Sequence, residues 1–387
     1  MEETDILIAG GGIAGMTAAC RLASAGHRVA LVAPPVPDGP DLRTTAILQP
    51  GIDTLTRAGA WAGMAGAASA LNVMRLVDAG GVERRPRENA DFRAGEVSDR
   101  PFGMNVPNTA IRPALEARIA ELGIPHFQSP ATGTVGRTRE RIVRLADGTQ
   151  ITADLVLAAD GRDSTLREAA RLPVRRWHYG QKALVFAVHH DRPHEGVSTE
   201  IHRTGGPLTL VPMPDRDGRP TSSVVWMTPG RRAVELNAMS DADISAELTQ
   251  ETMHIFGPLE ITGDRALWPI IGQMALRLTA PRLALIAEAA HVIPPIGAQG
   301  LNMSLADIEC IADLLEGASD PGADQILARY ETKRMPDIAM RVAGVDALNR
   351  FAQAEAQPLR DLRRVGLKAI YEITPIRRAA MRLGLGL

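Results

Sequence analysis

The sequence predicts an α/β fold in which a Rossmann-like domain is interrupted by an inserted, mainly antiparallel β-sheet domain and followed by C-terminal helices. Three features of the chain lead to this prediction. An apolar run over residues 5–9 is followed by a glycine-rich turn, a helical stretch over 16–25 and a second apolar run over 28–33, which together form one β-α-β unit. Between about 176 and 268, short apolar strands alternate with Gly- and Pro-rich turns. After a further apolar strand at 283–286, helices fill the chain to residue 387.

Length and composition indicate a two-domain protein that acts on small molecules. The chain has 387 residues, a formal net charge of −2 and 45% hydrophobic residues. It therefore lacks the basic excess that nucleic-acid binding needs and the polarity of a disordered chain. Cys20 and Cys310 each lie in an Ala- and Leu-rich helical stretch, which favours free thiols in a reducing compartment. No signal-peptide pattern and no long apolar stretch is evident, so we expect a cytoplasmic protein.

The pattern of the remaining chain predicts the other elements. We expect helices at 45–59, 111–122 and 303–315, and strands at 73–77, 142–145, 155–159, 183–189, 199–202, 208–212 and 222–227. Asp147-Gly148 predicts a hairpin turn between two of these strands.

The glycine-rich turn is the first motif with a chemical meaning. Gly10, Gly12 and Gly15 form a G-x-G-x-x-G pattern between a predicted strand and a predicted helix. In that setting the glycines permit a tight turn, a close approach of a pyrophosphate to the backbone and close packing of helix on strand, and the free amides at the helix start face the phosphates. The turn therefore predicts dinucleotide binding.

One contact usual in such folds is missing. An acidic side chain at the end of the second strand normally binds the adenosine ribose, about twenty residues after the turn. Here that position is Ala33, so we expect water or another group to hold the ribose, or the affinity to be lower.

Two later segments share one pattern, in which an apolar strand ends in polar residues at a turn and a helix follows. The first ends in Asp160-Gly161, which alone would be an ordinary turn. The second continues through Glu288 and a loop stiffened by Pro294 and Pro295 to a glycine-containing helix start. Such an amide-lined helix start suits an electron-rich ring edge or a developing negative charge.

These three segments, in this order and around a β insertion, resemble the flavoprotein aromatic hydroxylases built on the p-hydroxybenzoate hydroxylase fold. The resemblance covers nearly the whole chain. Three further segments resemble the ubiquinone-biosynthesis hydroxylases within that group, namely Asp41-Leu42-Arg43-Thr44-Thr45-Ala46, Phe102-Gly103-Met104-Asn105-Val106-Pro107-Asn108, and Tyr330 with Lys333-Arg334 and Asp346-Ala347-Leu348-Asn349-Arg350.

The resemblance implies that FAD is the cofactor, and it assigns residues to each part of it. The glycine turn, Gly10, Gly12, Ile13, Ala14 and Gly15, would meet the FAD pyrophosphate. Arg43 would lie close to the cofactor, and Asp160 and Gly161 match the second fingerprint of the family, which supports the cofactor and a transient nicotinamide donor. Glu288 takes the place of the acidic residue that binds the ribityl chain. The loop along the isoalloxazine ring matches at Pro295, Gly297, Gly300, Leu301 and Asn302.

This chain departs from the family pattern beside the ribityl chain. The family has Gly-Asp where this chain has Ala287-Glu288, which adds a methyl at a close approach and a methylene to the carboxylate. Together with Ala33, this substitution predicts looser FAD binding, since each weakened hydrogen bond to a charged group costs about 1.5–3 kcal/mol.

The resemblance also implies the activity and its partners. We expect an FAD-dependent monooxygenase that hydroxylates the aromatic ring of a polyprenylated phenol in ubiquinone biosynthesis, with dioxygen and with NAD(P)H or another electron donor. Other ubiquinone-biosynthesis proteins are candidate partners. The chain has no second G-x-G-x-x-G, so the donor should bind only transiently. No catalytic side chain is predicted, because positioning, phenol activation and water exclusion are the tasks left to the protein.

Two alternatives stay open on the sequence alone. The weakened contacts at Ala33 and Glu288 would also suit a non-catalytic assembly partner that binds flavin poorly. A soluble aromatic hydroxylase or a prenyl-chain reductase would keep the cofactor and change the chemistry.

The domain division follows from these elements. We assign 1–75, 101–175 and 269–345 to the FAD-binding domain, 76–100 and 176–268 to the β-sheet substrate domain, and 346–387 to a C-terminal helical segment. The last segment is basic and amphipathic after Pro358, so it either lies on an anionic membrane surface or packs on the enzyme body.

The histidines of the β insertion do not form a metal motif. His189, His190, His194 and His202 lack Cys or acidic partners at metal spacing, so we predict no metal and expect these side chains to face solvent or the substrate pocket.

Overall fold

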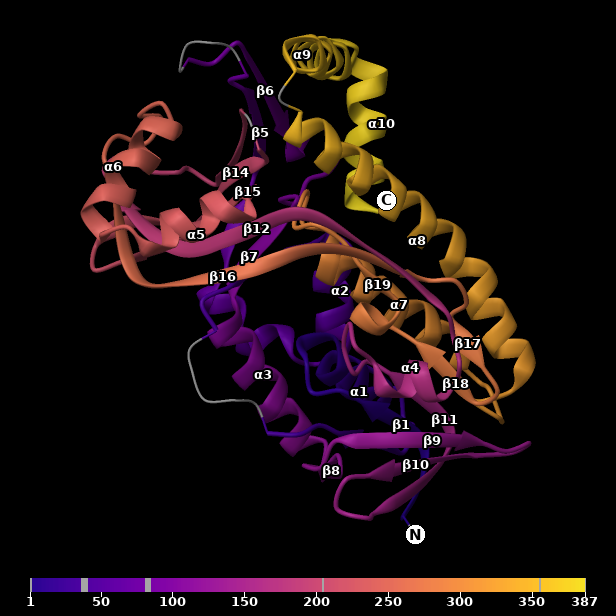
Figure 1. Ribbon diagram of the computed structural model, residues 1–387. Helices are drawn as coiled ribbons and strands as arrows, with labels where there is room; N and C mark the ends of the chain where they lie inside the picture. Colours follow the sequence, from indigo (N-terminus) through magenta and orange to yellow (C-terminus); the bar gives the residue numbers. More distant parts are fainter. Residues whose placement is uncertain (1, 36–40, 81–84, 204, 355, 387) are drawn as a thin grey trace.

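The computed structural model describes residues 2–35, 41–80, 85–203, 205–354 and 356–386. Two large sheets lie one above the other in Figure 1, and the long strands β12 (Val174–His190) and β16 (Leu259–Ala275) pass from one layer to the other. The predicted α/β class, with a parallel sheet, a separate antiparallel sheet and C-terminal helices, is confirmed.

The first sheet has a parallel centre made of strands far apart in the chain. Its order is β17-β18-β11-β1-β2-β8, and β9 and β10 add a hairpin beside β11. These strands are β1 (Glu2–Ala9), β2 (Val29–Val32), β8 (His126–Phe127), β9 (Ala131–Gly136), β10 (Arg141–Leu145), β11 (Gln150–Ala158), β17 (Thr279–Ala280) and β18 (Leu283–Leu285). The β10–β11 connection is the hairpin predicted at Asp147-Gly148. Because β1, β11 and β18 run parallel, their carboxyl ends open at the same edge, which is where ligands bind in such sheets.

Helices pack on the first sheet or on one another around it, and together they bury its core almost fully. They are α1 (Ile13–Ser24), α2 (Gln49–Arg57), α3 (Asn108–Glu121), α4 (Thr165–Ala169), α7 (Gln299–Leu315) and α8 (Asp324–Gln353). Ile6, Leu7 and Ile8 of β1 are completely buried, as are Ala18 and Ala19 of α1, whose small side chains let the helix approach the sheet.

The second sheet combines the insertion with two strands from earlier in the chain. Its order is β19-β16-β12-β15-β14-β13-β5-β6. Besides β12 and β16 it contains β5 (Val73–Asp78), β6 (Glu88–Arg93), β13 (Val197–His202), β14 (Pro207–Arg216), β15 (Arg219–Pro229) and β19 (His291–Val292). Strand β13 lies parallel to β5, so the insertion pairs with the segment around residue 75. The domain boundaries given above stay our proposal.

Two expected helix starts were wrong, and the mainly β insertion contains helices that were not expected. Residues 44–48 form strand β3 (Thr44–Leu48), paired with β7 (Gly103–Pro107), where we expected the start of a helix, and α2 begins only at Gln49. The β-branched side chains of Thr44, Thr45 and Ile47 favour the strand. The insertion also contains two helices, α5 (Gly230–Ala238) and α6 (Asp241–Glu251). Helix α7 starts at Gln299, four residues before the expected Met303. Strands β3 and β7 form a small third sheet with β4 (Ser69–Leu71), in the order β3-β7-β4. Short 3-10 turns of the described chain lie at Trp61–Gly63, Ala65–Ala67, Ala94–Glu96 and Ala287–Ala289.

The chain ends in two helices that continue from the long helix α8. Figure 1 shows α9 (Gln357–Glu372) and α10 (Thr374–Leu385) at the upper end of α8, beside β5 and β6. Helix α9 packs against β6 and α10. Within the described ranges, none of the helices is both long enough and apolar enough to cross a bilayer.

Candidate active site

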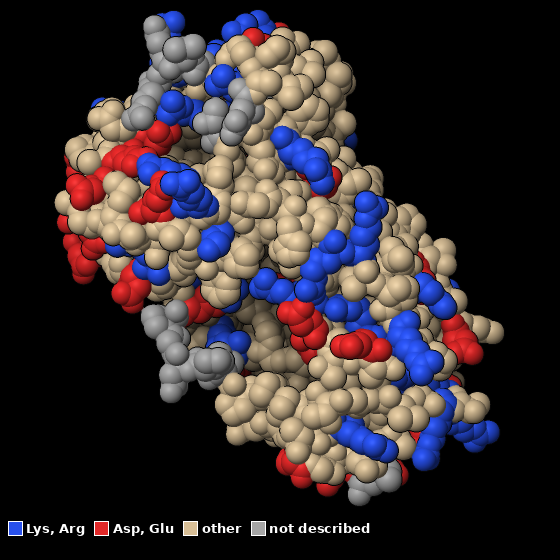
Figure 2. Space-filling model, viewed as in Figure 1, with Lys and Arg blue, Asp and Glu red and all other residues tan. Residues whose placement is uncertain are grey.

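One cleft of about 720 Å³ joins the glycine turn to the second sheet. Its lining runs from residues 9–15 through Asp160, Gly161 and Arg162 to the loop at 287–301, and ends at apolar residues of β12, β15 and β16. Figure 2 shows a hollow between the upper and lower parts of this face, with acidic and basic side chains near its rim. A cleft of this size suits a cofactor together with part of a substrate.

The glycine turn has the geometry of an anion cradle. A Cβ added at Gly10 would lie 2.1 Å from the carbonyl oxygen of Ala159, and one added at Gly15 would lie 2.0 Å from the carbonyl oxygen of Gly10, so both positions require glycine for packing. A Cβ at Gly12 would meet no protein atom within 4 Å. No side chain caps α1, which leaves its first backbone N–H groups available to a ligand. The turn therefore fits a pyrophosphate over Gly12.

Arg112 brings a positive charge to this turn and was not predicted from the sequence. Its Nη2 donates to the carbonyl oxygen of Gly11 at 3.0 Å, and its side chain lines the cleft. In the sequence, Arg112 is one arginine in an ordinary helical pattern, and only the packing of α3 against α1 places it beside Gly11. A guanidinium here complements the charge of a pyrophosphate.

Asp160 and Gly161 also lie on the cleft, with the carboxylate committed to the local turn. Asp160 Oδ2 accepts a hydrogen bond from the backbone N–H of Leu166 at 3.0 Å, and Oδ1 accepts one from the hydroxyl of Ser164. Gly161 has φ of +88°, a conformation that favours glycine. Asp160 therefore fixes the start of α4 and turns the backbone toward the cleft.

Arg43 belongs to a polar group at the mouth of the cleft. Its Nε and Nη2 each donate to the carboxylate of Asp41 at 2.7 Å, while Asn108 Nδ2 donates to the same carboxylate at 2.9 Å. Burial raises the pKa of Asp41, but these hydrogen bonds outweigh it and hold the pKa below its usual value. The hydrogen bond with Asp41 also raises the pKa of Arg43. Since the Arg43 guanidinium lies 4.9 Å from the ring centre of Trp268, the group joins the first domain to the second sheet.

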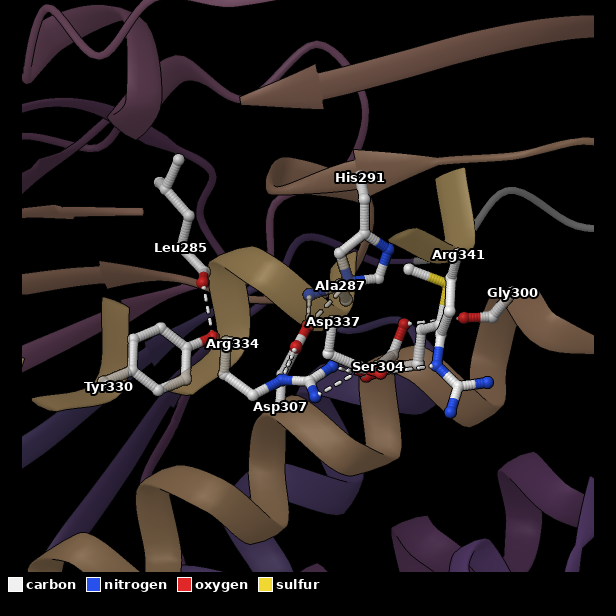
Figure 3. Close-up of polar contacts among 11 residues, drawn as sticks. Leu285, Ala287, His291, Gly300, Ser304, Asp307, Tyr330, Arg334, Asp337 and Arg341 are labelled. Atoms are coloured by element: carbon white, nitrogen blue, oxygen red, sulfur yellow. Dashed lines mark hydrogen bonds and ion pairs between the residues drawn. The ribbon is translucent and has the colours of Figure 1, made fainter. Parts of the chain in front are cut away.

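The turn that bears Glu288 is held by a buried carboxylate. Asp307 of α7 accepts hydrogen bonds from the backbone N–H of Ala287 at 3.0 Å and from His291 Nε2 at 2.8 Å, and pairs with Arg334 Nε at 2.8 Å. Figure 3 shows this carboxylate between Ala287, His291 and Arg334. Burial raises the pKa of Asp307, but its interactions with His291 and Arg334 outweigh burial and lower it. Ala287 itself has φ of +56°, where an alanine is strained.

The side chain of Glu288 stays available at the cleft. It is 53% exposed, and its Oε2 lies 3.8 Å from Arg162 Nε. Unlike Asp307, it is not tied down by short hydrogen bonds to the described residues, so it can reach a hydroxyl group of a ligand.

Most of the residues assigned to FAD line this single cleft. They are Gly10, Gly12, Ile13, Ala14, Gly15, Arg43, Asp160, Gly161, Glu288, Pro295, Gly300 and Leu301. Gly297 and Asn302 are not among its lining residues. Asn302 instead ties strand β3 to the start of α7, because its Nδ2 donates to the carbonyl oxygens of Ala46 and Ala298 and its Oδ1 accepts from the backbone N–H of Leu48. Its position in the structure thus indicates a supporting role for Asn302.

The far end of the cleft is apolar and lies against the second sheet. Ala183, Val185, Val225, Ile270 and Ile293 line it. Of the titratable side chains along the cleft, Asp41 is paired with Arg43 and His291 with Asp307. Apart from Glu288, which is half-exposed, the polar groups named here are committed to partners, and the described lining offers no free buried base. We therefore nominate no catalytic side chain.

Two of the four histidines of the insertion are placed differently from our expectation. His189 and His190 are buried in the second sheet, where they contact the hydroxyls of Thr221 and Ser222, and neither lines the cleft. Among the described residues, no group of three His, Cys, Asp or Glu side chains is arranged to hold a metal ion.

Comparison with protein families identifies the cofactor domain. The model of the FAD-binding domain family of flavoprotein monooxygenases matches residues 3–344. The ubiquinone hydroxylase UbiL of Rhodospirillum rubrum is 33% identical, covering 100% of this chain and 90% of its own length. The 3-demethoxyubiquinol 3-hydroxylase of Escherichia coli is 28% identical, covering 100% of this chain and 99% of its own.

Solved structures share the fold at lower sequence identity. HpxO of Klebsiella pneumoniae, complexed with FAD, superposes with a TM-score of 0.79 at 17% identity, covering 99% of this chain and 98% of its own. The p-nitrophenol 4-monooxygenase PnpA of Pseudomonas putida gives a TM-score of 0.77 at 17% identity, covering 98% and 97%.

Proposed function

The chain belongs to the FAD-binding domain family of flavoprotein aromatic monooxygenases, and on that premise we propose that it hydroxylates the aromatic ring of a polyprenylated phenol in ubiquinone biosynthesis. The substrate class is inferred from its relatives, two of which are named as ubiquinone-pathway hydroxylases. FAD is the cofactor of the family.

The observation that best supports the proposal is the continuity of the cleft. The same cavity runs from the uncapped start of α1 and Gly12 to the apolar walls at Val185, Val225 and Ile270. An apolar end of this kind suits a phenol that bears a hydrocarbon chain, since it buries that surface away from water.

Within this proposal the protein binds and orients. Gly12 and the first turn of α1, with Arg112, would hold the pyrophosphate; Glu288 would hold the ribityl hydroxyls; and residues 295–301 would line the ring. When bound and reduced by the electron donor, FAD would supply the chemistry by which one oxygen atom of dioxygen enters the phenol ring and the other leaves as water. The apolar walls exclude water from that reaction.

The proposal also names what the enzyme meets in the cell. Its partners are the polyprenylated phenol, dioxygen, and NAD(P)H or another transient electron donor, with other ubiquinone-biosynthesis proteins as candidates. We place the chain in the cytoplasm, in peripheral contact with the inner face of the membrane.

A deletion strain tests the proposal directly. Lipid extracts of the strain should accumulate a quinone precursor that lacks one ring hydroxyl, and the wild-type gene should remove it. In vitro, the FAD-loaded chain with a reductant and ¹⁸O₂ should add one labelled oxygen to that precursor. An unchanged quinone profile in the deletion strain would contradict the proposal.

A further inference from the structure

The two C-terminal helices present an apolar surface that no described part of the chain covers. Large exposed side chains are concentrated on them, namely Leu359, Leu362, Val365, Ile370, Ile373, Ile376 and Leu383. Leu362 and Val365 are 57% and 59% exposed. Apart from these helices and the end of α8, only a few exposed large apolar residues are scattered over other described elements. We call these seven residues the outer face of α9–α10.

The spacing shows that the outer face is continuous along each helix. In α9, Leu359, Leu362, Ile370 and Ile373 fall on one side with Gly366, at intervals that follow the helical turn. In α10, Ile376 and Leu383 lie seven residues apart and so share a side. This arrangement places the apolar side chains in a stripe turned away from the protein.

The opposite face of α9 and α10 packs against the rest of the protein. The apolar side chains of the outer face are therefore exposed on helices that are themselves packed in the fold. Tyr371 meets the ring of Phe92 edge-on at 5.9 Å, and Met381 and Leu385 are buried in the same cluster. Arg377 pairs with Glu96 at 2.8 Å, and Asp361 pairs with Arg87 at 2.7 Å. The helices are therefore held in place with their outer face in solvent.

The basic charge of α9 and α10 indicates that an anionic surface covers the outer face. Residues 357–385 contain seven Arg or Lys side chains against two acidic ones. Both acidic side chains already have basic partners, Asp361 in Arg87 and Glu372 in Lys368. Arg364, Arg378 and Arg382 are exposed and form no ion pair within the part of the chain that the structure describes. Figure 2 shows the region over α9 as mostly uncharged atoms, with Lys and Arg atoms along its lower border.

The same helices are linked to the cleft. Gln299, the first residue of α7, donates through Nε2 to the carbonyl oxygen of Gly384 in α10 at 3.0 Å, and its Oε1 accepts from Arg341 of α8 at 2.6 Å. The neighbouring residues Gly300 and Leu301 line the cleft. The outer face therefore has a fixed position relative to the site where the phenol would bind.

We propose that the outer face of α9–α10 is a membrane-contact surface, which lies on anionic phospholipid headgroups with its apolar side chains in the acyl boundary. A helix pair with a broad apolar stripe, unpaired basic side chains and no span of the bilayer has the composition of an interfacial element. The role of this surface rests on the proposed function, since a polyprenylated substrate resides in a membrane. The exposed apolar side chains and the basic side chains of α9 and α10 indicate the surface independently of that function.

Vesicle cosedimentation of the FAD-loaded full chain tests this surface. Binding should be strong to vesicles that contain phosphatidylglycerol, weaker to pure phosphatidylcholine, and weaker again when salt rises from about 0.1 M to 1 M. The double variant Leu362→Glu/Ile373→Glu should lower the partition coefficient at least about a hundredfold, because each of the two buried side chains contributes at least about a factor of ten. Arg378→Gln/Arg382→Gln should reduce the preference for phosphatidylglycerol.

A matched control uses exposed apolar residues elsewhere. Val135 in β9 and Val234 in α5 are 52% and 48% exposed, so Val135→Glu/Val234→Glu adds the same charges outside the outer face. This control should bind vesicles as the wild type does. Equal losses in both double variants, or no binding by the wild type, would overturn the proposal. The wild type could instead run as a dimer in size-exclusion chromatography. If Leu362→Glu/Ile373→Glu dissociated that dimer without changing vesicle binding, the membrane-contact proposal would be overturned, and a second copy of the chain would cover the outer face.

Failure of the surface and failure of the proposed function can be told apart. A water-soluble phenol without a prenyl chain should be hydroxylated equally by the wild type and by Leu362→Glu/Ile373→Glu, which leaves the cleft intact. Vesicle binding without any hydroxylation would refute the function and keep the surface. Hydroxylation without vesicle binding would refute the surface alone.

Discussion

Replacing Gly12 by alanine separates the packing of the glycine turn from its binding of FAD. Gly12 has φ of −73° and ψ of 169°, which any residue can adopt, and an added Cβ meets no protein atom within 4 Å. The FAD-free variant should therefore unfold with a free energy within about 0.5 kcal/mol of the wild type. Gly15→Ala should behave differently, because its Cβ would lie 2.0 Å from the carbonyl oxygen of Gly10 and so strain the fold itself.

The effect of Gly12→Ala should appear only when FAD binds. The new methyl would occupy the space of the pyrophosphate, and the loss of one hydrogen bond to a charged phosphate costs about 1.5–3 kcal/mol. The dissociation constant of FAD should then rise about 10- to 150-fold. Quenching of FAD fluorescence gives the affinity, and urea unfolding of the FAD-free chain gives the stability. The control is Gly66→Ala, since Gly66 is exposed and equally uncrowded. Wild-type FAD affinity in Gly12→Ala would refute the placement of the pyrophosphate.

Four further predictions concern the turn at Glu288, its support and the buried thiol. Ala287→Gly should raise the free energy of unfolding by about 0.5–1 kcal/mol in urea titrations, because it relieves an alanine at φ of +56°. Asp307→Asn should lower that free energy by about 3–5 kcal/mol near neutral pH, since Arg334 loses its buried partner. The pKa of Asp307 in the folded chain lies below its ordinary 3.8. The stability that the ionised Asp307 contributes is therefore complete above pH 3.8 and is lost as the pH falls through the folded pKa. In unfolding curves, the difference in free energy of unfolding between the wild type and Asp307→Asn should narrow below about pH 4. Glu288→Asp should retain FAD through dialysis better than the wild type, because it shortens the side chain to the length found in the family. Equal retention would contradict the prediction that the extra methylene of Glu288 loosens FAD binding. Cys20, whose pKa burial raises to about 12, should resist iodoacetamide in the folded chain and react after denaturation, as mass spectrometry would show.

The sequence predicted best where the chemistry is local. The glycine turn at Gly10, Gly12 and Gly15, the hairpin at Asp147-Gly148 and the strands of the insertion depend on residues close together in the chain, and the structure has each of these elements. The class of fold followed from their order.

What could not be predicted depends on partners distant in sequence. Strand β3 forms because it pairs with β7 about sixty residues later, and Arg112 reaches Gly11 only because α3 packs on α1. Asp307 looks like one polar residue in an apolar helix, yet it fixes the backbone of Ala287 across a tertiary contact. Asn302, which the resemblance assigns to the ring loop, also ties α7 to β3 through its hydrogen bonds. None of these contacts leaves a periodic signal in the chain.

Titration of the flavin-free chain with FAD measures whether the cleft between the glycine turn and the second sheet holds the cofactor. We expect saturable binding of one FAD per chain, with the yellow colour and the shifted absorbance of a bound flavin. Gly12→Ala and Arg112→Gln should each weaken this binding. A folded chain that takes up no FAD, or that binds it equally well with both substitutions, would contradict the assignment of the cleft.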